Sequence, residues 1–147
     1  MKGCRLSILV MAALLMLAAT ESAAGERLAV SASVANIRSG PGTTHDVLWQ
    51  VQKYYPIQVL KKLGAWYNIR DFEGDEGWIH ESLTKKVPTV ITIKDNCNVR
   101  SGPGTKHEVL FTVDKGIPFR VIGQEGSWLQ IEHADGDRGW IYKSLVW

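Results

Sequence analysis

The sequence contains little cysteine, which limits the covalent chemistry open to it. Cys4 and Cys97 are the two cysteines among 147 residues, and Cys4 lies in a segment that we expect to be removed. An intrachain disulfide is therefore not expected, although an exported compartment would permit one. Cys97 stands where an internal repeat has Ala35. A small buried core residue is the favoured interpretation, and a reactive thiol is the alternative.

The sequence also lacks a strong excess of charge. It has 17 basic and 15 acidic residues, and loss of Lys2, Arg5 and Glu21 with the N-terminal segment leaves the rest almost neutral. Nucleic-acid binding needs clustered cations that neutralise phosphates, whereas the lysines and arginines here are scattered among acids. Nucleic acid is therefore excluded as an expected partner.

Long hydrophobic runs are missing except at the N-terminus. Leu6 to Ala19 is an apolar run of 14 residues after a positively charged start, and the small residues Ser22-Ala23-Ala24 follow it. This pattern predicts a signal peptide over residues 1–24, and hence an exported protein, periplasmic or secreted. A retained membrane anchor is the alternative, but the run is shorter than the roughly 18 to 20 residues that span a bilayer. No membrane span is expected after cleavage.

One short stretch occurs twice and organises the rest of the chain. NIRSGPGT runs from Asn36 to Thr43, and NVRSGPGT runs from Asn98 to Thr105. A shift of 62 positions aligns Asn36–Leu83 with Asn98–Leu145 without a gap, and 24 of the 48 positions are identical. The chain is thus a tandem duplication, and each functional interpretation of one copy is testable in the other.

Each copy has the residue pattern of short β-strands. Apolar residues alternate at Val47, Trp49 and Val51, and the same alternation recurs 62 residues later, which is typical of half-buried strands. Glycine-containing turns precede WYNI, WLQI and both GWI segments, as in hairpins. Ser82-Leu83 and Ser144-Leu145 leave room for one 3₁₀ turn. The prediction is an all-β fold of two tandem small barrels, over residues 28–84 and 89–147, joined by a linker at 85–88.

The order of these motifs resembles the bacterial SH3 domain. NIRSGPGT is followed by a strand containing Val-Leu, then by Gly-x-Trp, and then by GWI with a Ser-Leu turn, at the same spacing in both copies. The resemblance implies two SH3-like barrels and a role in targeting the cell wall. Resemblance to the eukaryotic SH3 domain suggests a groove beside Trp66 and Trp128. Proline-rich ligands are not expected, because His80 and Leu83, like Tyr142 and Leu145, stand where the eukaryotic SH3 domain has Pro and Tyr.

No constellation for catalysis, metal binding or a cofactor is visible in the sequence. His45 and His107 are equivalent, but His80 corresponds to Tyr142 and His133 corresponds to Asp71, so a zinc site would exist in one copy at most. No spacing matches a zinc or calcium signature. SGPG leads toward a strand, and it is interpreted as a shaped turn instead of a phosphate loop. The two modules use the whole mature length, so no catalytic domain is expected, and the prediction is that the protein is not an enzyme.

Outward-facing aromatic residues are the remaining functional signal. Strand alternation turns Ile69, Ile79 and their equivalents inward and the tryptophans outward, which favours an interaction surface. The alternative is that the tryptophans cover barrel ends or pack the modules together. Arginine before SGPG could bind a carboxylate with two hydrogen bonds, or could equally fix the loop by bonding its carbonyls. The predicted ligand-binding residues are Arg38, Trp66, Trp78 and His80 in the first copy, and Arg100, Trp128, Trp140 and Tyr142 in the second.

We expect these residues to form one shallow cleft per module, between the SGPG loop and the outward tryptophans. The predicted function is a non-catalytic exported module that recognises peptidoglycan, or its peptide stems, in the bacterial cell envelope. The alternative is an adaptor that docks another exported envelope protein through the same aromatics. A wall hydrolase is a third interpretation, which clearing of wall material by the lone protein would support. Because only the first cleft contains a histidine, His80, the two clefts should differ in their response to pH.

Overall fold

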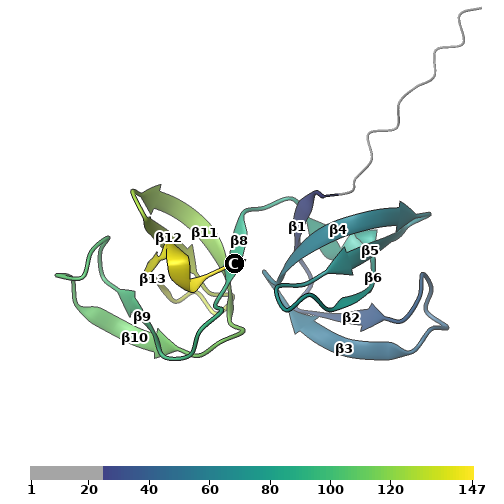
Figure 1. The fold of residues 1–147 in the computed structure, drawn as a ribbon, viewed down its shortest axis with the longest axis horizontal. Helices are drawn as coiled ribbons and strands as arrows, with labels where there is room; N and C mark the ends of the chain where they lie inside the picture. The colour runs from purple at the N-terminus through teal and green to yellow at the C-terminus, as the bar shows by residue number, and fades with distance from the viewer. Residues whose placement is uncertain (1–24) are drawn as a thin grey trace, which may run out of the picture.

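The computed structural model describes residues 25–147 as two β-barrels, one for each copy of the repeat (Figure 1). The predicted signal peptide, residues 1–24, lies outside the described residues. The first module comprises β1 (Arg27–Val30), β2 (Val34–Arg38), β3 (Val47–Gln52), β4 (Pro56–Leu63), β5 (Trp66–Arg70), β6 (Glu76–His80), the 3₁₀ turn η1 (Glu81–Leu83) and β7 (Thr84–Lys85). The second comprises β8 (Thr89–Ile91), β9 (Cys97–Arg100), β10 (Val109–Val113), β11 (Pro118–Glu125), β12 (Trp128–Glu132), β13 (Arg138–Tyr142) and η2 (Lys143–Leu145).

Each module is built from one antiparallel sheet that curls into a barrel. The strand order is β3-β2-β6-β5-β4-β1-β7 in the first module and β10-β9-β13-β12-β11-β8 in the second. The prediction of an all-β fold with two tandem small barrels is confirmed. The 3₁₀ turns lie at the predicted Ser-Leu positions, and the predicted hairpin glycines Gly64 and Gly126 have φ values of 59° and 58°, which a side chain would disfavour. The domain bounds 28–84 and 89–147 stay predictions.

The barrel interiors are filled by the strand residues that alternation turns inward. Ile37, Ile57, Val59, Ile69 and Ile79 are fully buried in the first module. The equivalents of four of them, Val99, Phe119, Ile131 and Ile141, are buried in the second module, and Val121, the equivalent of Val59, is partly buried. Such burial contributes about 1.5–3 kcal/mol for each large side chain.

The expected alternation along β3 is interrupted by a bulge. Ile37 pairs with Trp49, but the next residue, Arg38, pairs with Val47, so Leu48 is left over in the ladder. A bulge of this kind redirects the side chains beyond it. Val47 is therefore exposed, while Val51 is buried as predicted. The same register shift recurs in β10, between Val109 and Phe111.

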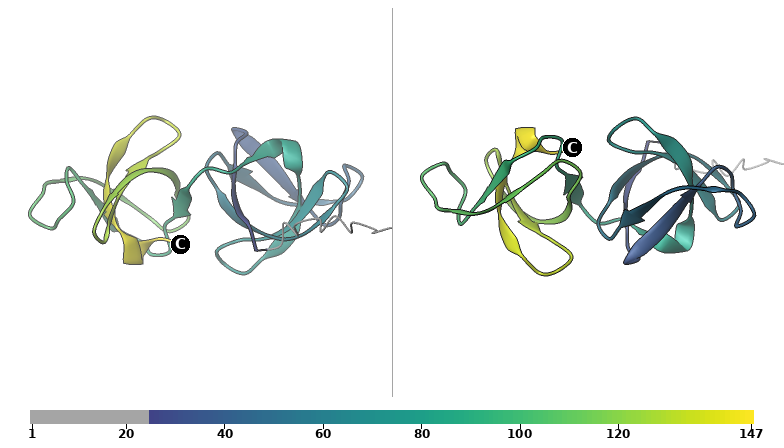
Figure 2. Two further views of the ribbon diagram at one scale, coloured as in Figure 1. Left: turned by 90° about the horizontal axis from the view of Figure 1, so that it is seen from above. Right: turned by 90° about the horizontal axis from the view of Figure 1, so that it is seen from below.

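The two barrels touch each other beside the short linker. The Arg27 guanidinium lies 4.0 Å from the centre of the Trp147 ring and donates to the carbonyl of Thr89 across 3.4 Å. A second contact pairs Lys115 with Glu73 at 3.5 Å. Figure 2 shows the barrels side by side along the long axis of the molecule. Over residues 25–147, the protein has no helix with the length and apolar character required to cross a bilayer.

Candidate functional site

Each module has a cleft at the position of the predicted site. In the first module the cleft has a volume of about 370 Å³. Trp66 and His80 form one wall, and Arg38 and Thr43 form the end at the SGPG loop. The remaining lining residues are Val34, Ala35, Asn36, Gln50 and Leu83. The second cleft, of about 600 Å³, contains the equivalents Arg100, Thr105, Trp128, Tyr142 and Leu145.

Strand register brings the two aromatic residues of each wall together. Trp66 on β5 pairs with His80 on β6, so their side chains emerge side by side on the outer face of the sheet. The rings meet edge to face, with centroids 5.2 Å apart. Trp128 and Tyr142 repeat the arrangement at 5.3 Å. Edge-to-face aromatic pairs stabilise each other by about 0.5–1.5 kcal/mol beyond their buried area, so each cleft has a preformed aromatic wall.

His80 is held in one orientation by the turn that follows it. Its Nδ1 accepts a hydrogen bond from the backbone N–H of Ser82 at 3.2 Å and lies 2.7 Å from the Ser82 hydroxyl. An Nδ1 that accepts leaves Nε2 as the protonated nitrogen of the neutral ring. Tyr142 makes no equivalent capping bond and its side chain is exposed. The two walls thus present different polar groups in the same place.

The arginine of each motif fixes the SGPG loop. Nη1 of Arg38 donates to the carbonyls of Thr43 at 3.1 Å and His45 at 3.0 Å. Arg100 makes the same two bonds, to Thr105 and His107, at 3.1 and 3.0 Å. Of the two roles that the sequence left open, the structural one is therefore observed. A guanidinium has five N–H donors, so the remaining ones are available to a ligand.

The first glycine of each SGPG motif is required for space and not for a left-handed backbone. Neither of them has a positive φ. A Cβ on Gly40 would lie 2.5 Å from Nδ1 of His45, and a Cβ on Gly102 would lie 2.5 Å from Nδ1 of His107. Real Cβ atoms do not approach other atoms so closely. His45 and His107 therefore pack closely on the backbone of the loop.

Two of the predicted tryptophans do not line the clefts. Trp78 is on the outer face as expected, but it pairs with Asn68 and Arg38 in the sheet and lies beneath the Lys61 ammonium, 5.6 Å from the ring centre. Trp140 has the corresponding position in the second module. The structure brings together Arg38, Trp66 and His80, and likewise Arg100, Trp128 and Tyr142, and leaves Trp78 and Trp140 beside them.

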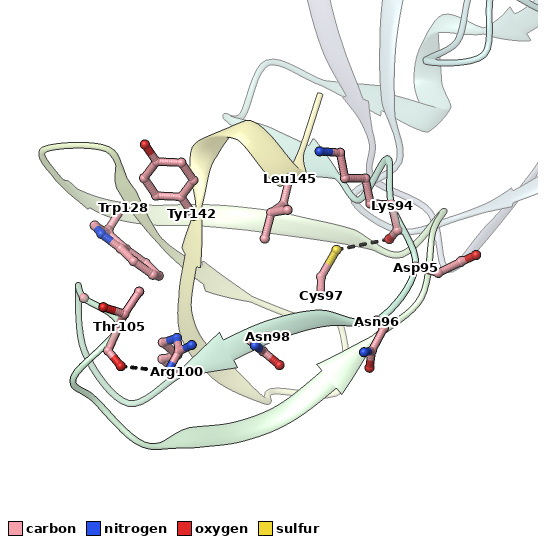
Figure 3. Close-up of a pocket in the computed structure, with 11 residues that line it drawn as sticks. Lys94, Asp95, Asn96, Cys97, Asn98, Arg100, Thr105, Trp128, Tyr142 and Leu145 are labelled. Carbon is pink, nitrogen blue, oxygen red and sulfur yellow. Dashed lines mark hydrogen bonds between the residues drawn. The ribbon is translucent and has the colours of Figure 1, made fainter.

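The second cleft is extended by a bend that sequence reasoning missed. Lys94, Asp95, Asn96 and Cys97 line it, as Figure 3 shows. The first cleft begins only at Val34, which corresponds to Asn96. A signal was present, because the 62-residue offset places Lys94 opposite Ala32.

Cys97 is the small buried residue that the repeat suggested. Its thiol donates to the carbonyl of Lys94 at 3.1 Å, and burial raises the pKa of the Cys97 thiol. A reactive thiolate is therefore disfavoured, since nucleophilic cysteines have lowered pKa values. Within residues 25–147, no group of three His, Cys, Asp or Glu side chains is arranged to hold a metal ion.

Asp71 fills a different role from its counterpart His133. Asp71 is buried and accepts hydrogen bonds from the Tyr55 hydroxyl at 3.0 Å and from the backbone N–H groups of Glu73 and Asp75 at 2.9 and 3.0 Å. Burial, together with the Asp71 carboxylate, raises the pKa of the Tyr55 phenol. This cluster is structural, because it closes the β5–β6 turn at a distance from the cleft residues.

Comparison with known proteins matches both modules to one family. The model of the bacterial SH3 domain matches residues 31–86 and 93–147. A Bacillus subtilis protein, YrvJ, whose name marks it as a candidate N-acetylmuramoyl-L-alanine amidase, is 30% identical over 122 residues, which is 76% of this chain and 23% of YrvJ. The candidate cell wall amidase LytH of Staphylococcus aureus is 38% identical over 52 residues, covering 35% of this chain and 18% of LytH.

The solved structures that match the chain are more distant in sequence. An NlpC/P60 family protein from Bacillus cereus is 14% identical with a TM-score of 0.38, over 82% of this chain and 55% of that one. NlpC1 from Trichomonas vaginalis is 11% identical with a TM-score of 0.36, over 82% and 44%. The chain spans less than a quarter of the length of the curated relatives described above.

These relatives correct one prediction. The sequence predicted that the protein is not an enzyme, because no catalytic constellation was visible. The relatives that share its modules are named as amidases, so that exclusion is wrong. The residues of the two modules contain no sequence pattern for catalysis, and in the relatives the matched region is a minor part of a longer chain. The fold is settled by the match of the family model to both repeats, and the chain belongs to the bacterial SH3 domain family.

Proposed function

We propose that the two modules bind peptidoglycan through its peptide stems. The observation that carries the proposal is the repetition of one cleft in both modules, with an edge-to-face aromatic wall and an arginine anchored at its end. Half of the aligned positions changed after the duplication, yet Arg38, Thr43 and Trp66 have identical counterparts. A relation to the cell wall is supported by the names of the relatives.

The chemistry of the cleft suits a short peptide with a carboxylate. Trp66 or Trp128 offers a flat apolar surface against which a methyl or methylene group can pack. Arg38 or Arg100 keeps N–H donors that its loop does not use, and a guanidinium can hold a carboxylate through two charge-assisted hydrogen bonds. Because Nη1 is already fixed by two carbonyls, little side-chain entropy remains to be lost on binding.

The proposed ligand implies a location in the cell envelope. Peptidoglycan lies outside the cytoplasmic membrane, so the protein would be exported, periplasmic or secreted. The predicted signal peptide over residues 1–24 supports the same location.

Retention on purified peptidoglycan sacculi tests this proposal. The variant Trp66→Ala, Trp128→Ala should lose most retention, because truncation of an aromatic anchor commonly costs on the order of 2 kcal/mol in binding. Trp78→Ala, Trp140→Ala is the matched control, since it removes two outward tryptophans beside the clefts, and it should be retained like the wild type. Circular dichroism confirms that each variant is folded. Equal retention of the wild type and both folded variants would contradict the assignment.

Docking of another envelope protein is the competing outcome of that experiment. Retention on sacculi only after addition of a cell-envelope extract would support an adaptor and contradict direct binding of peptidoglycan.

A second candidate function is participation in the cleavage of wall amide bonds. The observation that favours it is that the relatives carrying these modules are named as amidases. Cleavage of an amide releases an amine, so incubation of the chain with sacculi, followed by labelling of new amino groups, measures it. An increase over sacculi alone would support the function, and no increase would contradict it for this chain.

A further inference from the structure

The two clefts differ at the end farthest from the SGPG loop. In the first module that end is formed by Val34, whose side chain is exposed. In the second module the three residues before β9 form the end, and they are Lys94, Asp95 and Asn96. Their counterparts by the 62-residue offset are Ala32, Ser33 and Val34. The duplication has therefore kept the loop end of the cleft and changed the opposite end.

The backbone of the second module departs from that of the first at this end. Val34 is the first residue of β2 and pairs with Gln52. Asn96 instead has a φ of 51°, in the left-handed region that asparagine tolerates better than most residues. The ladder of β9 therefore starts one residue later than that of β2, where Cys97 pairs with Val113. Asn96 thus leaves the ladder and joins Lys94 and Asp95 in the bend that borders the cleft.

Three hydrogen bonds hold this bend in place. The backbone N–H of Asn96 donates to Oδ1 of Asp114 at 3.1 Å. The backbone N–H of Lys115 donates to Oδ1 of Asp95 at 3.0 Å. The Cys97 thiol donates to the Lys94 carbonyl at 3.1 Å. Lys94 thus projects from a fixed backbone, although its own side chain is exposed and flexible.

The result is a cleft with a cation at each end. Figure 3 shows Lys94 and Arg100 at opposite ends of the second cleft, with Cys97 and Leu145 between them. Asp95 is the acidic residue among the lining residues. Its side chain points away from the others in Figure 3 and is bonded to the backbone of Lys115. The first cleft has Arg38 at one end and the apolar Val34 at the other.

We propose that the second module selects peptides with two carboxylates, whereas the first accepts a carboxylate next to an apolar group. This inference rests on the proposed binding of peptide stems. Arg100 meets one carboxylate, and Lys94 meets the second at the far end of the cleft. Lys94 is the specificity-determining residue, because its replacement at the equivalent position of the first module is the uncharged Ala32.

The test uses two synthetic stem tetrapeptides in place of the wall. They are identical, L-Ala-γ-D-Glu-L-Lys-D-Ala, except that the α-carboxyl group of the D-glutamate residue is free in one and amidated in the other. Binding to the two-module chain is followed by NMR, because the indole N–H signals of Trp66 and Trp128 report on the two clefts separately. The dissociation constant of each module is measured for each peptide.

The variants exchange the charge between the modules. The second module of the wild type should prefer the free peptide by about two- to five-fold, the range that an exposed ion pair provides. Lys94→Ala should abolish this preference, and Ala32→Lys should create one in the first module. Added salt should reduce the preference, because exposed charges are screened.

Different outcomes separate this inference from the proposed function. If neither peptide shifts either indole signal, both fail. If both peptides bind the second module equally, and Lys94→Ala changes nothing, the selectivity is contradicted while stem binding stands. A preference that survives Lys94→Ala would also overturn the role of Lys94.

Discussion

Replacement of Tyr55 by phenylalanine should destabilise the first module alone. The Tyr55 hydroxyl donates to a carboxylate oxygen of Asp71 across 3.0 Å, and Asp71 is buried. Tyr55→Phe keeps the ring and its contact with Phe72 but leaves that oxygen without its donor. In the second module the equivalent residues are Ile117 and His133, so this cluster has no counterpart there.

The expected loss follows from the type of hydrogen bond. A bond to a charged group contributes about 1.5–3 kcal/mol. Asp71 keeps its two backbone donors, from Glu73 and Asp75, which favours the lower half of that range. For a domain of this size, such a loss lowers the melting temperature by on the order of 10 °C.

The dependence on pH gives an independent check. Burial and the Asp71 carboxylate raise the pKa of Tyr55 in the folded state, whereas an unfolded tyrosine ionises near pH 10. A pKa that is raised on folding contributes stability that is complete below about pH 10 and is lost as the pH rises above it. The wild type should therefore lose stability in alkali, and Tyr55→Phe should lose less.

Urea denaturation followed by the indole signals of Trp66 and Trp128 measures the two modules separately. Tyr54→Phe is the control, because no hydrogen bond of the Tyr54 hydroxyl is found among the described residues. A loss below about 0.5 kcal/mol, within the range of ordinary surface substitutions, would refute the reasoning. An equal loss in both modules would refute it too.

Two further predictions concern the SGPG loop and the thiol. Gly40→Ala should cost about 1–3 kcal/mol through overpacking against His45, measured by thermal unfolding. Gly42→Ala should cost less, because its Cβ would stay 3.5 Å from the same ring; equal costs would contradict the close-approach argument. Burial raises the pKa of Cys97, so iodoacetamide at pH 8 should modify the folded protein more slowly than the urea-denatured protein. Mass spectrometry measures both rates, and equal rates would show that the thiol is accessible.

Much of the fold was predictable because the duplication made each local pattern appear twice. Strand alternation located Ile69 and Ile79 in the core, and turn glycines such as Gly64 marked the hairpins. The bulge at Leu48 was not predictable, because it depends on register between strands and not on the pattern along one strand.

The candidate site was predictable in part. Alternation along a strand predicts which face of the sheet a side chain lies on, but not where on that face it lies. Trp66 and Trp78 were therefore both predicted to line the cleft, whereas of these two only Trp66 does so. The repeat offset places Lys94 opposite Ala32, but an exposed lysine before a strand does not by itself indicate a cleft. The position of Lys94 depends on the left-handed backbone of Asn96. It also depends on hydrogen bonds between the bend and Asp114 and Lys115, which lie about 20 positions further along the chain. The relation to proteins named as amidases was not predictable either, because the two modules contain no sequence pattern for catalysis.

The contact between Arg27 and Trp147 has a consequence for ligands that carry more than one peptide. It joins the first strand of one barrel to the last residue of the other. The two modules are therefore connected by this contact as well as by the linker, and the distance between the two clefts is constrained. Binding at one cleft then raises the effective concentration of a neighbouring stem at the other, but only for stems at the matching distance. The two modules together would bind a polymer more tightly when its stems have the matching spacing. One module alone could not make this distinction.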